Sequence, residues 1–307
     1  MEIINDDVCI FIPTLNEAPT IGSLIRRFRE RGYRHILVVD GNSSDGTADI
    51  ARTEGARVEI QTGRGKGNAI IEALDLIDRP YVLMLDGDGT YAPEEAEVML
   101  RPLFEGADHV IGNRLENPDA GALTRLNRFG NAVINYLFKM AHGMYLFDIL
   151  SGYRAFTLAS AKMLHLKESG FEIETEMAAE AVRHGQNVAV VPVQYRTRPG
   201  TDTKLSPLKD GLKIISTVYR MAKMSNPLFY FGLIGLIFVA FGSVTGLYVI
   251  YEWFQRIEHI PLTILTMLLL VLGFNIFMFG VISDMILTFH REVMREIYRL
   301  KPPNSPK

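Results

Sequence analysis

The sequence has little cysteine and little net charge, and both scarcities exclude classes of protein. Its 307 residues contain one cysteine, Cys9, so no disulfide can form within the chain, and its apolar neighbours predict a buried thiol. The formal net charge of −3 gives no indication of nucleic-acid binding. The opening residues, MEIINDDVCIF, lack a basic segment and a long apolar run, so we expect no signal peptide.

Several catalytic motifs are also missing from the sequence. The histidines form no HExxH pair and no cluster with cysteine, so a zinc site is not expected. There is no GxSxG elbow and no P-loop spacing, which disfavours α/β-hydrolases and P-loop ATPases. The chain is long enough for one large domain plus an appendage.

The first two thirds of the chain alternate between apolar runs and amphipathic segments. The apolar runs predict buried strands at residues 8–13, 35–40, 57–61, 81–85, 109–112 and 188–195. Helical spacing lies mostly between them, at residues 21–28, 69–77, 93–104, 123–140, 158–164 and 172–184. This alternation predicts an α/β fold with a mostly parallel, doubly wound sheet.

Two carboxylates follow the strand predicted at residues 81–85, in the sequence Asp86-Gly87-Asp88-Gly89. Open α/β sheets bind ligands at the carboxyl ends of their strands. Paired carboxylate oxygens suit Mg²⁺ or Mn²⁺, which take further ligands from water and substrate phosphates. One interpretation is therefore a metal–diphosphate site, and the other is an Asp/Gly turn that merely ends the strand.

A glycine-rich basic loop, GRGKGN at residues 63–68, precedes the helix predicted at 69–77. Free N–H groups and the helix dipole favour anions at such a position, and Lys66 adds a positive charge. The alternative is a basic surface turn. Farther along, Glu172, Glu174 and Glu176 open another predicted helix, where acids suit the N-terminal dipole.

The last third of the chain is strongly apolar. Residues 228–251 and 261–283 are uncharged runs long enough to cross a bilayer, and the short connector permits only a hairpin. Basic residues flank the hairpin on both outer sides, which by the positive-inside rule predicts that the preceding domain and both termini are cytoplasmic. The alternative is a helical hairpin buried in a soluble protein. Residues 207–226 have the pattern of an interfacial amphipathic helix.

The motifs occur in a fixed order: IPTLNE, VVDGNSSDGT, GRGKGNA, LMLDGDGTY, IGNR, DILSGYR, and then Arg198 and Lys204. Together they resemble family 2 glycosyltransferases of the GT-A fold, and more closely the polyprenyl-phosphate sugar synthases. The combination of DGNS, LDGDGTY, LSGYRAF, GFEIETEM and NPLFYFG is most similar to archaeal members that make dolichyl-phosphate sugars for S-layer N-glycosylation. The resemblance covers nearly the whole chain.

This resemblance implies four segments. A Rossmann-like GT-A catalytic domain is expected at residues 1–206, and an interfacial helix at 207–227. A transmembrane hairpin of two helices follows at 228–289, and a basic cytoplasmic tail at 290–307.

The resemblance also implies roles for residues near the donor nucleotide. Pro13, Leu15 and Glu17 match a nucleotide-contacting PxYxE motif, with Leu15 where tyrosine often stands. Asp40 matches the acid after the second strand, and Gly41 stands where many relatives have a second aspartate. The base that is recognised, uracil or guanine, therefore stays open at this point.

The remaining matches concern metal, phosphate and acceptor. Asp86, Gly87 and Asp88 match the DxD motif, with Asp88 the better metal ligand, and Thr90 stands where mannose synthases have a metal-binding glutamine. Phosphate-neutralising positions are matched by Arg114, Arg198 and Lys204, and the acceptor-phosphate position by Arg128. Asp148 either orients the acceptor or sugar, or is a loop carboxylate paired with Arg154.

The implied reaction moves a sugar from a nucleotide diphosphate to dolichyl or polyprenyl phosphate, with inversion and with Mg²⁺ or Mn²⁺ as cofactor. Its place would be protein N-glycosylation or cell-surface glycan synthesis. We expect UDP-GlcNAc as donor, then UDP-glucose, then GDP-mannose as in a dolichyl-phosphate mannose synthase. The expected partners are the donor, the lipid phosphate and membrane lipid, while homo-oligomerisation stays open. The rivals are a sugar nucleotidyltransferase and a non-catalytic membrane scaffold.

Overall fold

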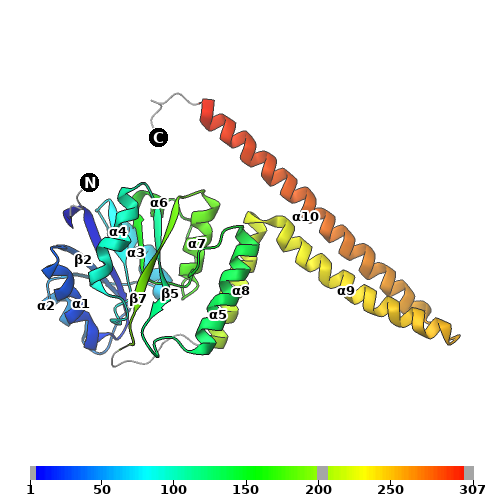
Figure 1. Ribbon diagram of the computed structural model, residues 1–307, viewed down its shortest axis with the longest axis horizontal. Helices are drawn as coiled ribbons and strands as arrows, with labels where there is room; N and C mark the ends of the chain where they lie inside the picture. The colour runs from blue at the N-terminus through cyan, green and yellow to red at the C-terminus, as the bar shows by residue number, and fades with distance from the viewer. Residues whose placement is uncertain (1–4, 199–206, 301–307) are drawn as a thin grey trace. The chain divides into compact units, whose positions relative to one another are not determined.

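The computed structural model describes residues 5–198 and 207–300 (Figure 1). They divide into two compact units between Val218 and Tyr219. The strands of the first unit are β1 (Val8–Thr14), β2 (His35–Asp40), β3 (Arg57–Ile60), β4 (Tyr81–Met84), β5 (His109–Pro118), β6 (Arg154–Thr157) and β7 (Val188–Tyr195). Its helices are η1 (Asn5–Asp7), α1 (Ala18–Glu30), α2 (Thr47–Thr53), α3 (Lys66–Leu76), η2 (Pro93–Glu95), α4 (Ala96–Phe104), α5 (Arg125–His142), α6 (Leu158–Lys162) and α7 (Ile173–Arg183). The helix α8 (Pro207–Ser225) extends across the division.

The strands of the described first unit form one seven-stranded sheet in the order β3-β2-β1-β4-β6-β5-β7. Every pairing is parallel except those of β6, which is antiparallel to both β4 and β5. In the centre, Phe11 of β1 pairs with Leu37 of β2 on one side and Met84 of β4 on the other. The expected mostly parallel α/β sheet is confirmed.

Helices cover both faces of the sheet (Figure 1). Each face has its own apolar core. Successive strand residues point to opposite faces, so Ile10 packs with Phe28 of α1 on one side. On the other side Phe11 packs with Ile70 of α3 and Met177 of α7. Burial on both faces explains why the central strands are continuous apolar runs.

Three departures from the expected elements concern the sheet and the loops around it. The strand β6 was not predicted, because it is short and begins with Arg154, a charged residue that is fully buried. The helix α3 begins at Lys66 rather than residue 69, because the N–H of Gly67 in its first turn finds an acceptor in Ser169. The strand β5 continues to Pro118, since β7 pairs with it again beyond an irregularity.

The second unit contains two long helices, α9 (Pro227–Phe254) and α10 (Ile260–Leu300). Both are long and apolar enough to cross a membrane, and only 11% of the most apolar stretch of each is buried. Glycines allow the two helices to approach closely. A Cβ on Gly235 would lie 2.7 Å from the carbonyl oxygen of Gly273, and one on Gly273 would lie 2.8 Å from that of Gly235. Such small-residue contacts are typical of helix pairs within membranes.

Candidate active site

The sheet topology gathers the predicted polar residues at one edge. The strands β1, β2, β4, β5 and β7 all run in one direction, so their carboxyl ends lie on the same side. The antiparallel β6 begins at that edge, which brings the loop before Arg154 there as well. Ligand sites of open α/β sheets lie at this edge.

Asp88 is buried and held by its neighbour Thr90. Its Oδ1 accepts hydrogen bonds from the Thr90 backbone N at 3.0 Å and the Thr90 hydroxyl at 2.6 Å. Its Oδ2 lies 3.5 Å from the Arg198 guanidinium. Burial and the negative charge of Asp86 raise the pKa of the Asp88 carboxyl, although Thr90 and Arg198 oppose that rise. The oxygens of Asp88 and Asp86 form a donor set that fits Mg²⁺ or Mn²⁺, and a bound cation would offset the effect of Asp86 on Asp88.

Asp86 takes part in a second ion network. It accepts a hydrogen bond from the Lys66 ammonium, which also lies 2.6 Å from Glu174 Oε1. Burial alone would lower the pKa of Lys66, but the two carboxylates raise it above its ordinary value. Gly152 packs directly against this group, because a Cβ there would lie 2.5 Å from Asp86 Oδ2 and 2.9 Å from Lys66 Nζ.

The glycine-rich loop rests on the chain that precedes α7. Gly67 N donates to Ser169 O at 2.9 Å, and a Cβ on Gly67 would lie 1.9 Å from Glu168 O. Gly65 has φ +92°, and a Cβ there would lie 2.3 Å from Ser169 O. Glu176 of α7 fixes the supporting chain by accepting from two backbone N–H groups, those of Lys167 and Glu168. The glycines are therefore required for the packing that places Lys66 beside Asp86.

Arg198 reaches the site because the chain after β7 crosses the segment that follows Asp88. Arg196 N donates to Thr90 O at 2.9 Å, and Tyr195 forms a bridge with Tyr91. Arg198 Nη2 then donates to Glu17 Oε1 at 2.7 Å. The predicted residues Glu17, Asp88 and Arg198 are thus brought together, whereas Lys204 lies outside the described residues.

Asp40 connects the two loops at the expected nucleotide end of the site. Its carboxylate accepts from the Thr14 hydroxyl at 3.0 Å, and from the backbone N and hydroxyl of Ser43 at 2.7 and 2.6 Å. Pro13 is buried at the end of β1, while the Leu15 side chain beyond it is exposed. Asp40 therefore supports the shape of the loops next to the exposed Leu15.

Asp148 pairs with Arg114, and the expected alternative pairing with Arg154 is wrong. Arg114 Nε and Nη2 donate to Asp148 Oδ2 and Oδ1 at 2.8 and 2.9 Å, and Arg114 N donates to Oδ2 at 3.0 Å. The Tyr195 ring lies 5.3 Å from the guanidinium carbon. Asp148 is completely buried, and it raises the pKa of Arg114 although burial alone would lower it. Arg154 instead donates to the carbonyl oxygens of Ser151 and Ile149.

Arg128 lies in the first turn of α5, with an exposed side chain. No contact among the described residues links this side chain to the ion networks of the site. The same helix exposes four large apolar side chains, those of Leu126, Phe129, Tyr136 and Met140. Its other face is buried through Ile134 and Phe138, so α5 presents a second apolar surface to its surroundings.

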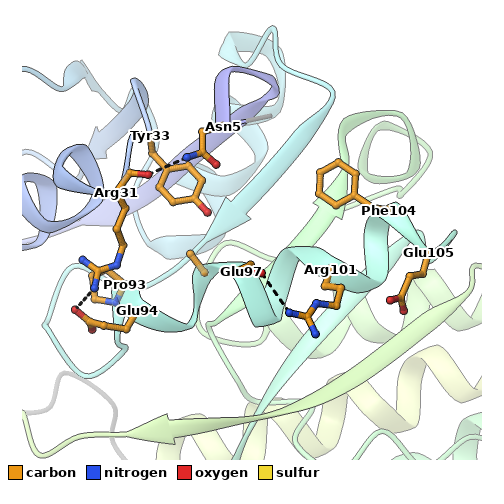
Figure 2. Close-up of a pocket in the computed structure, with 10 residues that line it drawn as sticks. Asn5, Arg31, Tyr33, Pro93, Glu94, Glu97, Arg101, Phe104 and Glu105 are labelled. Atoms are coloured by element: carbon orange, nitrogen blue, oxygen red, sulfur yellow. Dashed lines mark hydrogen bonds and ion pairs between the residues drawn. The ribbon is translucent and has the colours of Figure 1, made fainter. Parts of the chain in front are cut away.

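Two other features of the first unit lie among residues with no predicted role. His165, Glu180 and His184 have ligand atoms within 4.8 Å of one another, but Arg183 donates to both Glu180 oxygens at 2.8 and 2.6 Å. A groove of about 660 Å³ lies along α4 and the end of α1. Figure 2 shows two ion pairs among its charged side chains, Arg31 with Glu94 and, along α4, Arg101 with Glu97. None of the residues that line it is a predicted site residue.

Comparison with known proteins decides the family. Residues 9–163 match the family described as Glycosyl transferase family 2. The chain is also 50% identical over 299 residues to Glycosyltransferase AglJ of Haloferax volcanii, covering 96% of this chain and 99% of the relative. The chain belongs to glycosyltransferase family 2. The expected family membership is therefore confirmed.

Further relatives agree with this assignment. This family 2 glycosyltransferase is 34% identical over 221 residues to Dolichyl-phosphate hexose transferase of Haloferax volcanii, covering 70% of this chain and 94% of the relative. The crystal structure of glucosyl-3-phosphoglycerate synthase from Mycobacterium tuberculosis with Mg²⁺ and UDP shares the fold. Its TM-score is 0.58 at 22% identity, and the match covers 70% of this chain and 79% of that one.

Sequence reasoning missed two parts of the site in this glycosyltransferase. Glu174 was interpreted through the helix dipole, whereas its carboxylate contacts Lys66. Gly152 was read only as part of a loop motif, whereas it leaves room for Asp86 and Lys66. The acids at residues 172–176, at the start of a helix, gave a signal for Glu174, but nothing local indicated its partner.

Proposed function

We propose that this glycosyltransferase moves a sugar from a UDP-sugar to dolichyl or polyprenyl phosphate at a membrane surface. The observation that carries the proposal is the pair of carboxylates Asp86 and Asp88, surrounded by cations at the ligand-binding edge of the sheet. The chain has in addition two helices that could span a membrane. This combination suits a donor with a diphosphate and an acceptor with a lipid tail.

At the donor end, Asp88 and Asp86 would hold the divalent cation. When bound, that cation supplies Lewis-acid stabilisation of the diphosphate leaving group. Arg198, 3.5 Å from Asp88, adds positive charge beside it. Support comes from glucosyl-3-phosphoglycerate synthase, whose structures with Mn²⁺ and UDP-glucose share this fold.

At the acceptor end, the reaction requires neutralisation of the negative charge of the lipid phosphate rather than a strong base. A lipid phosphate is already an anion at neutral pH, so its oxygen attacks the anomeric carbon as the bond to the diphosphate breaks. Inversion follows from this single displacement. Arg114 and the exposed Arg128 would reduce the repulsion between acceptor and donor. Asp148, held by Arg114, would orient the acceptor through that arginine.

The membrane assignment is part of the proposal. The helices α9 and α10 leave most of their apolar surface exposed, and α5 exposes apolar side chains on the catalytic unit. We place both termini and the catalytic unit in the cytoplasm, because basic residues flank the hairpin on its outer sides. The product would be a lipid-linked sugar for protein N-glycosylation or a cell-surface glycan such as the S-layer. The similarity to a protein named Dolichyl-phosphate hexose transferase supports this acceptor class.

The donor nucleotide is tested by calorimetric titration of UDP and GDP in the presence of Mg²⁺. We expect UDP to bind at least about tenfold more tightly, a difference of about 1.4 kcal/mol, because Gly41 stands where relatives have a second acid near the base. The sugar is expected to be GlcNAc first and glucose second. Asp40→Ala should weaken UDP more than it weakens inorganic pyrophosphate, since Asp40 holds the loops at the nucleotide end. Tighter binding of GDP would reverse the choice of donor in favour of GDP-mannose.

The role of the hairpin is tested by a chain that ends at Asn226. We expect it to keep Mg²⁺-dependent UDP binding, because Lys66 and Arg198, which contact Asp86 and Asp88, lie in the first unit. Transfer to a long polyprenyl phosphate should fall much more than transfer to a short, soluble analogue. Equal losses with both acceptors would instead show that the helices help to build the active site.

A further inference from the structure

The Lys66 ammonium is shared between two carboxylates from distant parts of the chain. Lys66 begins α3, Asp86 follows β4, and Glu174 lies in the first turn of α7. The ammonium contacts Asp86 Oδ1 and lies 2.6 Å from Glu174 Oε1. All three side chains are largely withdrawn from solvent, Glu174 most of all at 4% exposure.

The surrounding packing is built to hold this arrangement. The loop that carries Lys66 rests on backbone atoms of Glu168 and Ser169, so closely that Gly65 and Gly67 leave no room for a Cβ. That support is continuous with α7, which carries Glu174. Gly152 closes the other side, against both Asp86 Oδ2 and Lys66 Nζ. The geometry thus fixes Lys66 between its two partners.

The position of Glu174 at a helix N-terminus does not account for this contact. Glu176 belongs to the same first turn, and its carboxylate accepts hydrogen bonds from the backbone N–H groups of Lys167 and Glu168. Glu174 instead directs its carboxylate to the ammonium of another element. The contact of Glu174 with Lys66 therefore alters the balance of charge around Asp86, the other partner of the ammonium.

We propose that Glu174 is a positioning residue that acts through Lys66 to keep Asp86 available to the divalent cation and donor. The inference rests on the proposed function. Because the Lys66 ammonium is shared with Glu174, it neutralises the negative charge of Asp86 only in part. Asp86, Asp88, Lys66 and Glu174 together carry a net charge of −2 when all are ionised, and loss of Glu174 reduces it to −1. The cation then competes with Lys66 for Asp86.

The test measures UDP binding by calorimetry on the full-length protein in detergent, over a series of Mg²⁺ concentrations. Glu174→Gln should raise the Mg²⁺ concentration for half-maximal UDP binding by about threefold to tenfold, and saturating Mg²⁺ should restore most of the affinity. Glu174→Asp, which keeps the charge, should recover part of the difference. The matched control is Glu176→Gln, which removes a charge from the same turn while its amide oxygen still accepts from the N–H groups of Lys167 and Glu168 that support the loop of Lys66.

A double-mutant cycle then tests whether Glu174 acts through Lys66. In a Lys66→Met background, Glu174→Gln should change the Mg²⁺ requirement by less than about twofold. An equal effect in both backgrounds, or an equal effect of Glu176→Gln, would overturn the inference. If Lys66→Met does not fold, as judged by thermal unfolding, the comparison of the Gln and Asp variants with Glu176→Gln decides it. Failure of the unsubstituted protein to bind UDP with Mg²⁺ would instead contradict the proposed function.

Discussion

Replacement of Asp88 by alanine is expected to lower the rate of sugar transfer by about a hundredfold to a thousandfold or more. The carboxylate is the central oxygen donor of the site, and Thr90 holds it in place with two hydrogen bonds. The fold should survive, because burial and Asp86 already disfavour the ionised form and raise its pKa. Transfer assays with titrated Mn²⁺, together with thermal unfolding, measure both effects.

A matched control for this variant is Asp49→Ala on α2, whose side chain is 86% exposed. It removes the same group from the surface and should leave both transfer and unfolding temperature unchanged. Full metal-dependent turnover in Asp88→Ala would show that the cation is held elsewhere. It would remove the basis for the assignment of the DGD sequence as the metal site.

Replacement of Asp148 by alanine is expected to destabilise the fold by about 3–5 kcal/mol, because it leaves the Arg114 guanidinium buried without its carboxylate. Both Asp148 oxygens accept from this side chain, and Asp148 itself is completely buried. Thermal unfolding of the full chain in detergent should show the loss. Asp148→Asn should lose less, since the amide oxygen still accepts a hydrogen bond.

The effect of the Arg114–Asp148 pair on stability can be measured apart from its effect on sugar transfer by removing both charges. The double variant Arg114→Met with Asp148→Ala should regain most of the lost stability, because no buried charge is left unpaired. Its rate of sugar transfer should nevertheless stay low, since the cation proposed to face the acceptor phosphate is gone. A stable but inactive Asp148→Ala variant would contradict this division and would assign Asp148 directly to the reaction.

Much of the sheet could be predicted because its central strands are buried on both faces. The bounds of β2 follow directly from its apolar run, and those of the partly buried edge strand β7 also match the expected range. The edge that gathers Asp40, Asp86 and Asp88 follows from the parallel topology alone. The strand β6 could not be predicted, because the buried Arg154 interrupts the apolar pattern that marks a strand.

Partners across the site could not be predicted, because they depend on how distant segments pack. Pairing with Arg154 was one of two alternatives for Asp148 in the sequence, but the loop turns its carboxylate toward Arg114 in β5. The helix dipole offered a local explanation for the acid at Glu174. Its contact with Lys66 depends on the packing of the glycine-rich loop on the chain before α7. Local patterns therefore indicate candidate residues, whereas their contacts follow only from the packing of distant segments.

The most direct measurement is transfer of radiolabelled sugar to dolichyl phosphate by membranes that contain this protein. Each reaction receives Mg²⁺ and one donor from a panel of UDP- and GDP-sugars, and the lipid extract is counted. We expect label in a lipid-linked sugar with a UDP-sugar, most of all UDP-GlcNAc, and loss of that label with chelator or with Asp88→Ala. No lipid-linked label from any donor, with pyrophosphate released from a nucleoside triphosphate and a sugar phosphate instead, would contradict it.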